Sequence, residues 1–286
     1  MQLTFGDVYL ENHAGIAAFD ALSGSETFGA DIAAHGDVVM ENHSFVLGDV
    51  VAGGDVFMSN NSEIGGDLYL AGELVQQHSS SVDGIVHALD LPPEPCECGY
   101  DLDAVMAWRS ENNDNFKLQQ DPCLKRFFDG GSLVVDCSGG GCCCSSRAHG
   151  APGRCPVILP AGAYYLEGFE VRGNAVVELA EGAEVELYVK DRLVVERNAR
   201  LQPDPARADD LLIVFGADTD AGGQLVLRNN SDLAMMLYAP RARLALPNHV
   251  YLYGAIVVRE LHGGNHGRLF TDTTVCSDPP ALTCNR

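Results

Sequence analysis

The feature that most constrains this chain is a repeat of about 18 residues between Gly29 and Gly84. A Gly-Asp-Val triplet recurs at that distance, at Gly36 and Gly54. A fixed period means that one structural unit is stacked several times, and 18 residues is short for a unit that contains a helix. Short alternating apolar runs between Gly, Asn, Asp and Ser indicate three strands and three turns per repeat. The sequence therefore predicts an all-β fold, a parallel β-helix or β-solenoid with coils of about 18 residues.

Asparagine recurs at turn positions of these coils. Asn tolerates the left-handed turn conformation, and stacked Asn side chains can form hydrogen bonds along the axis of a stack. We interpret these residues as a turn ladder and not as ligands. They are Asn42, Asn60, Asn174, Asn198, Asn230, Asn248 and Asn265.

Composition divides the chain into N-terminal coils (1–91), a Cys-rich insert (92–160), C-terminal coils (161–275) and a tail (276–286). Residues 6–13 match residues 36–43 at a distance of 30, so we expect an inserted loop within 14–28. In the Cys-rich insert, an acidic first turn followed by apolar positions at helical spacing predicts one short α-helix from Asp101 to about Asn112. Leu133–Val135 is expected to be a strand that returns to the coils.

Charge argues against one class of partner. The chain has 18 Lys and Arg against 40 Asp and Glu, a net charge of −22. Binding to nucleic acid needs a basic surface, so we expect no nucleic-acid partner. No apolar run is long enough for a membrane span, and the first residues do not form a signal peptide. If the protein is exported, its targeting segment is missing from this chain.

Ten cysteines indicate an oxidising compartment, and hence an extracellular or cell-surface location. Their pairing cannot be deduced from the sequence. The closing pair is expected to clip the Pro-rich tail. The disulfide candidates are Cys96, Cys98, Cys123, Cys137, Cys142, Cys143, Cys144, Cys155, Cys276 and Cys284.

Two kinds of metal site deserve comparison with simpler interpretations. The histidines of four Asn-His dipeptides could lie on neighbouring coils and bind Zn²⁺ or Cu²⁺ through their imidazoles. We prefer the simpler interpretation that a polar residue follows each Asn turn. Cys142–Cys144 with His149 could bind Zn²⁺, but disulfides suit their spacing better. The Ca²⁺-binding glycine repeat of β-rolls is not matched, and we expect no cofactor. The four Asn-His dipeptides begin at Asn12, Asn42, Asn248 and Asn265.

The C-terminal half carries Gly-x-Tyr-Tyr at 162–165, Tyr238-Ala239-Pro240 and Tyr253-Gly254-Ala255-Ile256-Val257. Over about 162–275 it resembles the β-helical domain of bacterial type IV pilus assembly proteins of the PilX kind. More distantly, it is similar to the polymer-forming β-helix of bactofilins. The resemblance implies a surface or appendage role and transfers no catalytic residues.

An enzymatic alternative is a carbohydrate-active β-helix. Glycoside hydrolysis needs two carboxylates flanking the sugar, and the candidates are Asp209, Asp210, Asp218 and Asp220. They fall in Pro- or Gly-rich loops, so we interpret them as solvated loop acids. Tyr251 and Tyr253 share one face of a strand, which suits either sugar stacking or a packed column. No catalytic residues are assigned.

The sequence therefore predicts an extracellular structural or interaction protein, a surface appendage or filament subunit. Its expected partners are further copies of itself, other surface or pilus proteins, or glycans. Residues 1–10 offer a strand without an obvious cap, whereas the tail is Pro-rich, so the two ends differ. Unpaired strand edges accept further strands, which makes head-to-tail association a hypothesis.

Overall fold

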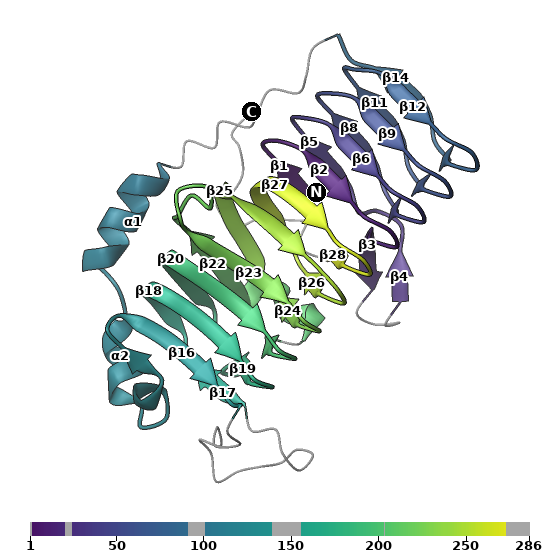
Figure 1. Cartoon of the computed structure of the whole chain (residues 1–286). Helices are drawn as coiled ribbons and strands as arrows, with labels where there is room; N and C mark the ends of the chain where they lie inside the picture. Colours follow the sequence, from purple (N-terminus) through teal and green to yellow (C-terminus); the bar gives the residue numbers. More distant parts are fainter. Residues whose placement is uncertain (1, 21–24, 91–100, 139–155, 203, 273–286) are drawn as a thin grey trace. The chain divides into compact units, whose positions relative to one another are not determined.

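The structure, a computed structural model, describes residues 2–20, 25–90, 101–138, 156–202 and 204–272. It is mostly β, with predominantly parallel strand pairing (Figure 1). Its contacts divide the chain into two compact units. Unit 1 comprises residues 1–100 and 243–286, and unit 2 comprises residues 101–242. No helix within the described ranges is long and apolar enough to cross a membrane.

Unit 1 consists of short strands. They are β1 (Gln2–Thr4), β2 (Val8–Leu10), β3 (Gly15–Asp20), β4 (Ser25–Thr27), β5 (Ile32–Ala34), β6 (Val38–Met40), β7 (Phe45–Val46), β8 (Val50–Ala52), β9 (Val56–Met58), β10 (Glu63–Ile64), β11 (Leu68–Leu70), β12 (Leu74–Gln76), β13 (Ser81–Val82), β14 (Val86–Ala88), β26 (Tyr251–Tyr253), β27 (Ile256–Gly263) and β28 (Arg268–Asp272).

Strands of successive repeats in unit 1 pair in parallel. One series is β5, β8, β11 and β14, in which Ile32, Val50, Leu68 and Val86 are paired at intervals of 18 residues. A second series is β6, β9 and β12, and a third is β7, β10 and β13. Each repeat thus contributes three short strands, which confirms the predicted period. Side chains alternate between the core and the outer face because successive residues of a strand point to opposite sides.

The N-terminal strands lie inside this stack, contrary to the expectation of a free strand at residues 1–10. β1 pairs with β27 on one edge and with β5 on the other. β2 pairs with β27 and β6, and β3 pairs with β28 and β7. The edges of β1–β3 are therefore occupied on both sides. The loop expected within 14–28 is partly a strand pair, since β4 runs antiparallel to β3.

Unit 2 contains longer strands and the helical elements. They are α1 (Leu102–Glu111), α2 (Asn115–Gln120), the 3₁₀-helix η1 (Leu124–Arg126), β15 (Phe128–Asp129), β16 (Ser132–Asp136), β17 (Val157–Leu159), β18 (Gly162–Arg172), β19 (Val176–Leu179), β20 (Val185–Glu196), β21 (Arg200–Leu201), the 3₁₀-helix η2 (Pro205–Asp210), β22 (Leu211–Phe215), β23 (Gln224–Arg228), β24 (Asp232–Ala234) and most of β25 (Met236–Leu246).

The parallel pairing in unit 2 runs from β16 to β18, from β18 to β20, and from β20 to both β22 and β23. The predicted strand at 133–135 is thus confirmed as β16. The predicted helix is confirmed as α1, and Asp101 caps it by accepting a hydrogen bond from the Ala104 amide at 3.0 Å, but the segment holds a second α-helix, α2, where only one was predicted. Buried Leu102 and Met106 form the inner side of this helix.

Ion pairs and apolar contacts hold the helical segment to the strands of unit 2. Arg109 pairs with Glu186 at 2.5 Å and lies over the Tyr188 ring, and both Arg241 guanidinium nitrogens contact the Asp103 carboxylate. Leu118 of α2 is fully buried. Cys123 and Cys137 are both disulfide-bonded. The other eight cysteines lie outside the described residues, so the disulfide framework stays a prediction.

Candidate functional site

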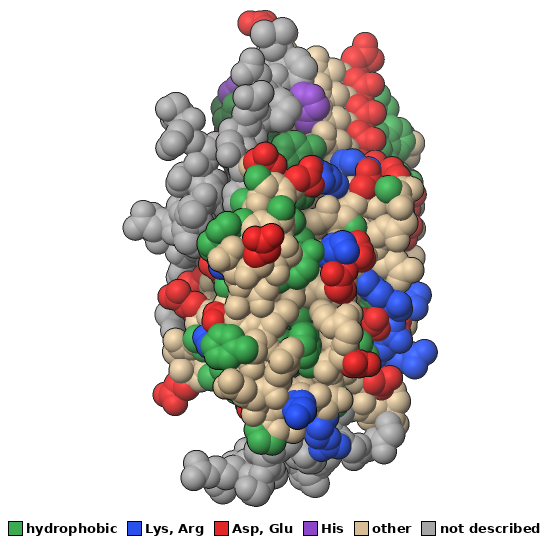
Figure 2. All heavy atoms as spheres, turned by 90° about the vertical axis from the view of Figure 1, so that its left-hand side faces the viewer, with side chains coloured by type: hydrophobic (Ala, Val, Ile, Leu, Met, Phe, Trp, Pro, Cys, Tyr) green, Lys and Arg blue, Asp and Glu red, His purple; other side chains and the backbone are tan. Residues whose placement is uncertain are grey.

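Aspartates at the repeated turns of unit 1 form two ladders of carboxylates. In one ladder, the Asp37 amide donates to Asp7 at 2.9 Å and the Asp55 amide donates to Asp37 at 2.8 Å. In the other, Asp49 donates to Asp31 at 3.0 Å and Asp67 donates to Asp49 at 2.8 Å. Each carboxylate therefore satisfies a backbone N–H one repeat later. Figure 2 shows a column of acidic side chains on one face of the molecule.

The glycines before Asp37, Asp55 and Asp67 have a steric reason. A Cβ added at Gly54 would overlap the Asp37 carboxylate oxygen, and one added at Gly36 would overlap that of Asp7. The pair Gly-Asp is thus one device, in which glycine leaves room for the carboxylate of the preceding repeat. The repeated Gly-Asp pair was visible in the sequence as a sign of the period, but its hydrogen-bonding role was not.

The asparagine ladder is present in both units. Asn42 donates to Asn12 at 3.1 Å, Asn198 donates to Asn174 at 3.1 Å, and Asn230 donates to Asn198 at 3.2 Å. Asn174, Asn198, Asn230 and Asn248 have the left-handed backbone expected of turn asparagines. Asn60 accepts the His43 amide through its carbonyl, and Asn265 lies 3.5 Å from Glu11. The Asn side chains thus form a ladder between Asn12 and Asn42 and from Asn174 to Asn230, whereas for Asn60, Asn248 and Asn265 the ladder stays a prediction.

Four histidines of unit 1 form a column of stacked rings, which we call the histidine column: His249, His266, His13 and His43. Their ring centroids are 5.0, 5.1 and 4.9 Å apart in that order, with interplanar angles of 2°, 6° and 2°. All four are exposed and have φ between 57° and 59°. The two pairs are far apart in the sequence, but β3 pairs with β28, which brings His13 next to His266.

One arginine, Arg268, lies beside the histidine column. Arg268 donates to the His13 carbonyl, lies over the Phe45 ring and contacts Glu26 at 3.8 Å. Loss of hydration lowers the pKa of His266, and the nearby His249, His13 and Arg268 lower it further. The ring of His266 is therefore neutral, and a potential ligand, over a wider pH range than a free histidine.

A shallow depression of about 230 Å³ lies elsewhere on unit 1. Its lining includes Asp7, Tyr9, Glu260 and His262. His262 lies 2.9 Å from Glu11, and the Tyr9 hydroxyl donates to Glu41 at 2.7 Å. That hydrogen bond, with burial and the carboxylate charges, raises the pKa of Tyr9. The polar groups are thus engaged with one another.

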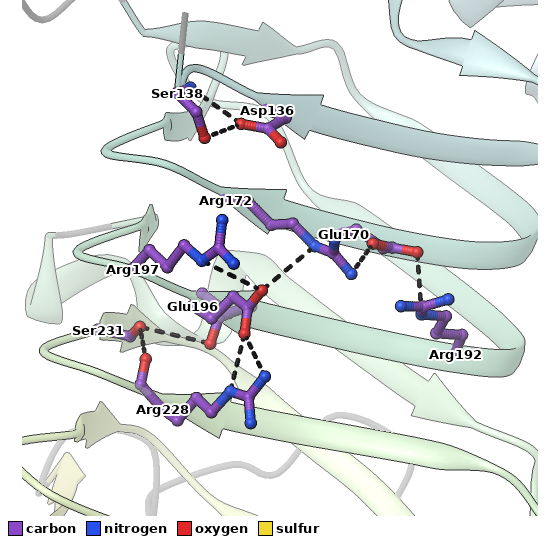
Figure 3. Close-up of polar contacts among 10 residues, drawn as sticks. Asp136, Ser138, Glu170, Arg172, Arg192, Glu196, Arg197, Arg228 and Ser231 are labelled. Atoms are coloured by element: carbon purple, nitrogen blue, oxygen red, sulfur yellow. Dashed lines mark hydrogen bonds and ion pairs between the residues drawn. The ribbon is translucent and has the colours of Figure 1, made fainter.

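Unit 2 carries a column of alternating charges across four strands (Figure 3). Parallel pairing aligns Asp136 with Arg172, Arg172 with Glu196, and Glu196 with Arg228. Glu196 is only 3% exposed and contacts Arg228 at 2.7 Å and Arg172 at 3.6 Å. Burial tends to raise the pKa of Glu196, but the hydrogen bond from Arg228 and the neighbouring arginine charges outweigh it and lower that pKa.

The neighbouring carboxylate in the same region is also paired. Glu170, 8% exposed, contacts Arg172 at 2.5 Å and Arg192 at 2.9 Å. Because both buried carboxylates are held by arginines, the arrangement favours a stabilising network over acid–base chemistry. These residues were not among the predicted site residues. Their signal was a charged residue just before successive Asn turns, at Arg172, Glu196 and Arg228.

The loop acids considered for catalysis have local partners. Arg207 contacts Asp210 at 2.5 Å, and Asp218 accepts the Asp220 amide at 2.8 Å. Asp209 is exposed. Asp218 and Asp220 lie in a loop, as predicted, whereas Asp209 and Asp210 lie in the 3₁₀-helix η2 and not in a loop.

Tyr251 and Tyr253 belong to an aromatic column of unit 1. The Tyr253 ring stacks on Phe270 at 4.8 Å, the Tyr251 ring lies 6.4 Å from Phe270, and Phe19 meets Tyr253 edge-on at 5.0 Å. Phe270 is buried, whereas both tyrosines are partly exposed. The packed-column and sugar-stacking interpretations are therefore both compatible with this geometry.

Comparison with known proteins gives one family match. Residues 167–275 match the model of a domain of unknown function, DUF7305. This match covers less than half of the chain and names no activity. The chain matches none of the curated proteins and none of the solved structures.

Proposed function

We propose that this chain is an extracellular structural or interaction protein, a rigid parallel β-helix that acts as a surface appendage or filament subunit. Its mechanism is end-to-end association with a second copy, beginning at the last repeat of unit 1, residues 74–90. The parallel pairing at intervals of 18 residues supports the β-helix. The cysteine content and the resemblance to pilus assembly proteins support the extracellular location and a pilus partner.

The observation that carries this proposal is a core column that ends in an exposed residue. Ile32, Val50 and Leu68 occupy successive rungs and are 2%, 0% and 0% exposed. Val86 occupies the next rung and is 47% exposed, and Ile85 beside it is 63% exposed. Among the residues that the structure describes, the apolar interior of the stack is therefore exposed at this repeat.

The backbone of the same repeat offers pairing sites. Among the residues that the structure describes, β12, β13 and β14 each pair on one edge, with β9, β10 and β11. In Figure 1, β12 and β14 are the last strands of their series. Unpaired edges with exposed apolar side chains are templates for further strands.

A second copy is the occupant that fits best. It brings an identical open repeat with the same strand spacing, so a two-fold arrangement would pair both edges and cover both apolar surfaces at once. Glu73, just before this repeat, and Asp83 within it are exposed and would bring like charges together. Association should therefore strengthen as salt screens them.

The test is the mass of the purified chain in solution, by light scattering after gel filtration, with negative-stain electron microscopy. We expect dimers for the wild type, because a two-fold contact closes on itself, with a larger dimer fraction at higher salt. Val86→Lys should give monomers with an unchanged circular dichroism spectrum. Val51→Lys, on the outer face of β8, is the matched control and should assemble normally. A wild type that is monomeric at its highest soluble concentration would refute the proposal.

The second candidate function is glycan binding, favoured by the aromatic column. Tyr251 and Tyr253 present partly exposed rings beside Phe270, and such rings can stack on sugars. Screening a glycan array with the wild type and with Tyr251→Ala tests this function. A glycan that still binds Tyr251→Ala as it binds the wild type would not be held by the aromatic column.

A further inference from the structure

The histidine column places the same metal-binding group on four adjacent rungs of unit 1. The slot itself does not require histidine, since Asn61 and Ser79 hold the equivalent left-handed position in the next two repeats. Four of the nine histidines of the chain nevertheless lie in consecutive slots. A structural turn alone does not account for this concentration.

We propose that the histidine column binds divalent transition-metal ions, each ion held between two neighbouring imidazoles. Neutral imidazole is a good ligand for Cu²⁺, Ni²⁺ and Zn²⁺, and affinity for nitrogen ligands is highest for Cu²⁺. The site does not depend on the end-to-end association proposed above.

The geometry requires only a small adjustment. Two imidazole nitrogens bound to one ion at about 2.0–2.1 Å lie about 3 Å apart. The rings now lie parallel at 4.9–5.1 Å, so neighbouring ring tips must approach by roughly 2 Å. As the rings stand, no group of three or more potential ligands among the described residues is arranged around one point. Because the four side chains are exposed, tilting two of them meets little packing resistance.

The position of each histidine decides how binding responds to substitution. Replacing the two inner residues, His266→Asn and His13→Asn, leaves His249 and His43 three rungs apart, too far to share an ion. Replacing the two outer residues, His249→Asn and His43→Asn, leaves His266 and His13 as neighbours 5.1 Å apart. Both double variants lose two histidines and place asparagine in a slot where Asn61 is already accommodated. They therefore form a matched pair.

The experiment is calorimetric titration of the untagged, metal-free chain with Cu²⁺, repeated with Ni²⁺ and Zn²⁺, and electron paramagnetic resonance of the Cu²⁺ sample. We expect Cu²⁺ to bind most tightly, with nitrogen couplings from imidazole. The outer double variant should retain one such site, and the inner double variant should bind at least tenfold more weakly. Bound Cu²⁺ should also raise the melting temperature of the wild type and of the outer variant only. No imidazole-coordinated Cu²⁺ in the wild type, or equal binding by the two double variants, would overturn the proposal.

Discussion

The Gly-Asp device of unit 1 can be tested by a double-mutant cycle at Asp37 and Gly54. Asp37→Ala removes the carboxylate that accepts the Asp55 amide at 2.8 Å. Gly54→Ala adds a Cβ that would overlap the same carboxylate. Both single substitutions should therefore break one hydrogen bond, and the second adds steric conflict. We expect their effects on the free energy of unfolding to be strongly non-additive.

The structure sets the magnitudes. A hydrogen bond to a charged group contributes about 1.5–3 kcal/mol, and this one is exposed, so Asp37→Ala should destabilise by about 1.5 kcal/mol. Gly54→Ala adds overpacking and should destabilise by about 2.5 kcal/mol. Once the carboxylate is absent, the closest remaining atoms to the added Cβ lie at 3.1 Å. The double variant should then lose about 2 kcal/mol, half of the additive sum of about 4 kcal/mol.

Urea unfolding followed by circular dichroism measures these differences in free energy, provided that the slope of the free energy against urea concentration is the same in all variants. Gly168→Ala is the control, because an added Cβ there meets nothing nearer than 3.3 Å. It should change stability by less than about 1 kcal/mol. An additive double variant would show that Gly54 is not there to accommodate the Asp37 carboxylate.

Two further predictions concern unit 2. Glu196→Gln should destabilise by about 2–3 kcal/mol at pH 7, because it leaves Arg172 and Arg228 without their shared carboxylate. Since the folded-state pKa of Glu196 is lowered, its contribution is present above the unfolded-state pKa and is lost as pH falls through the folded value. The free energies of unfolding of the wild type and of Glu196→Gln should therefore converge in acid. A difference between them that does not change with pH would contradict this. Phe169→Ala removes a fully buried ring and should cost about 3–5 kcal/mol, measured as a lower unfolding midpoint. A loss below about 1 kcal/mol would mean that the site collapses around the smaller residue.

Much of the local structure was predictable because its causes are local. The period of 18 residues follows from repeated Gly, Asp and Asn at fixed distances, and paired strands in β5, β8 and β11 reproduce it. The helix at Leu102–Glu111 was predictable from its capping aspartate and its apolar spacing. The histidines of the column were also visible as Asn-His dipeptides, but their arrangement was not.

The sequence by itself determined the repeat, the short strands and the identity of the turns, because each depends on backbone preferences within a few residues. Only the tertiary structure decided which repeats are neighbours. β1, β2 and β3 pair with β27 and β28, segments more than 240 residues away along the chain. Any parallel strand edge of suitable length can accept another, so such pairing leaves no local signature. That pairing brings His13 next to His266. Among the described residues of unit 1, it also means that the unpaired strand edges belong to the repeat of residues 74–90, which contains Val86, and not to the N-terminal strands.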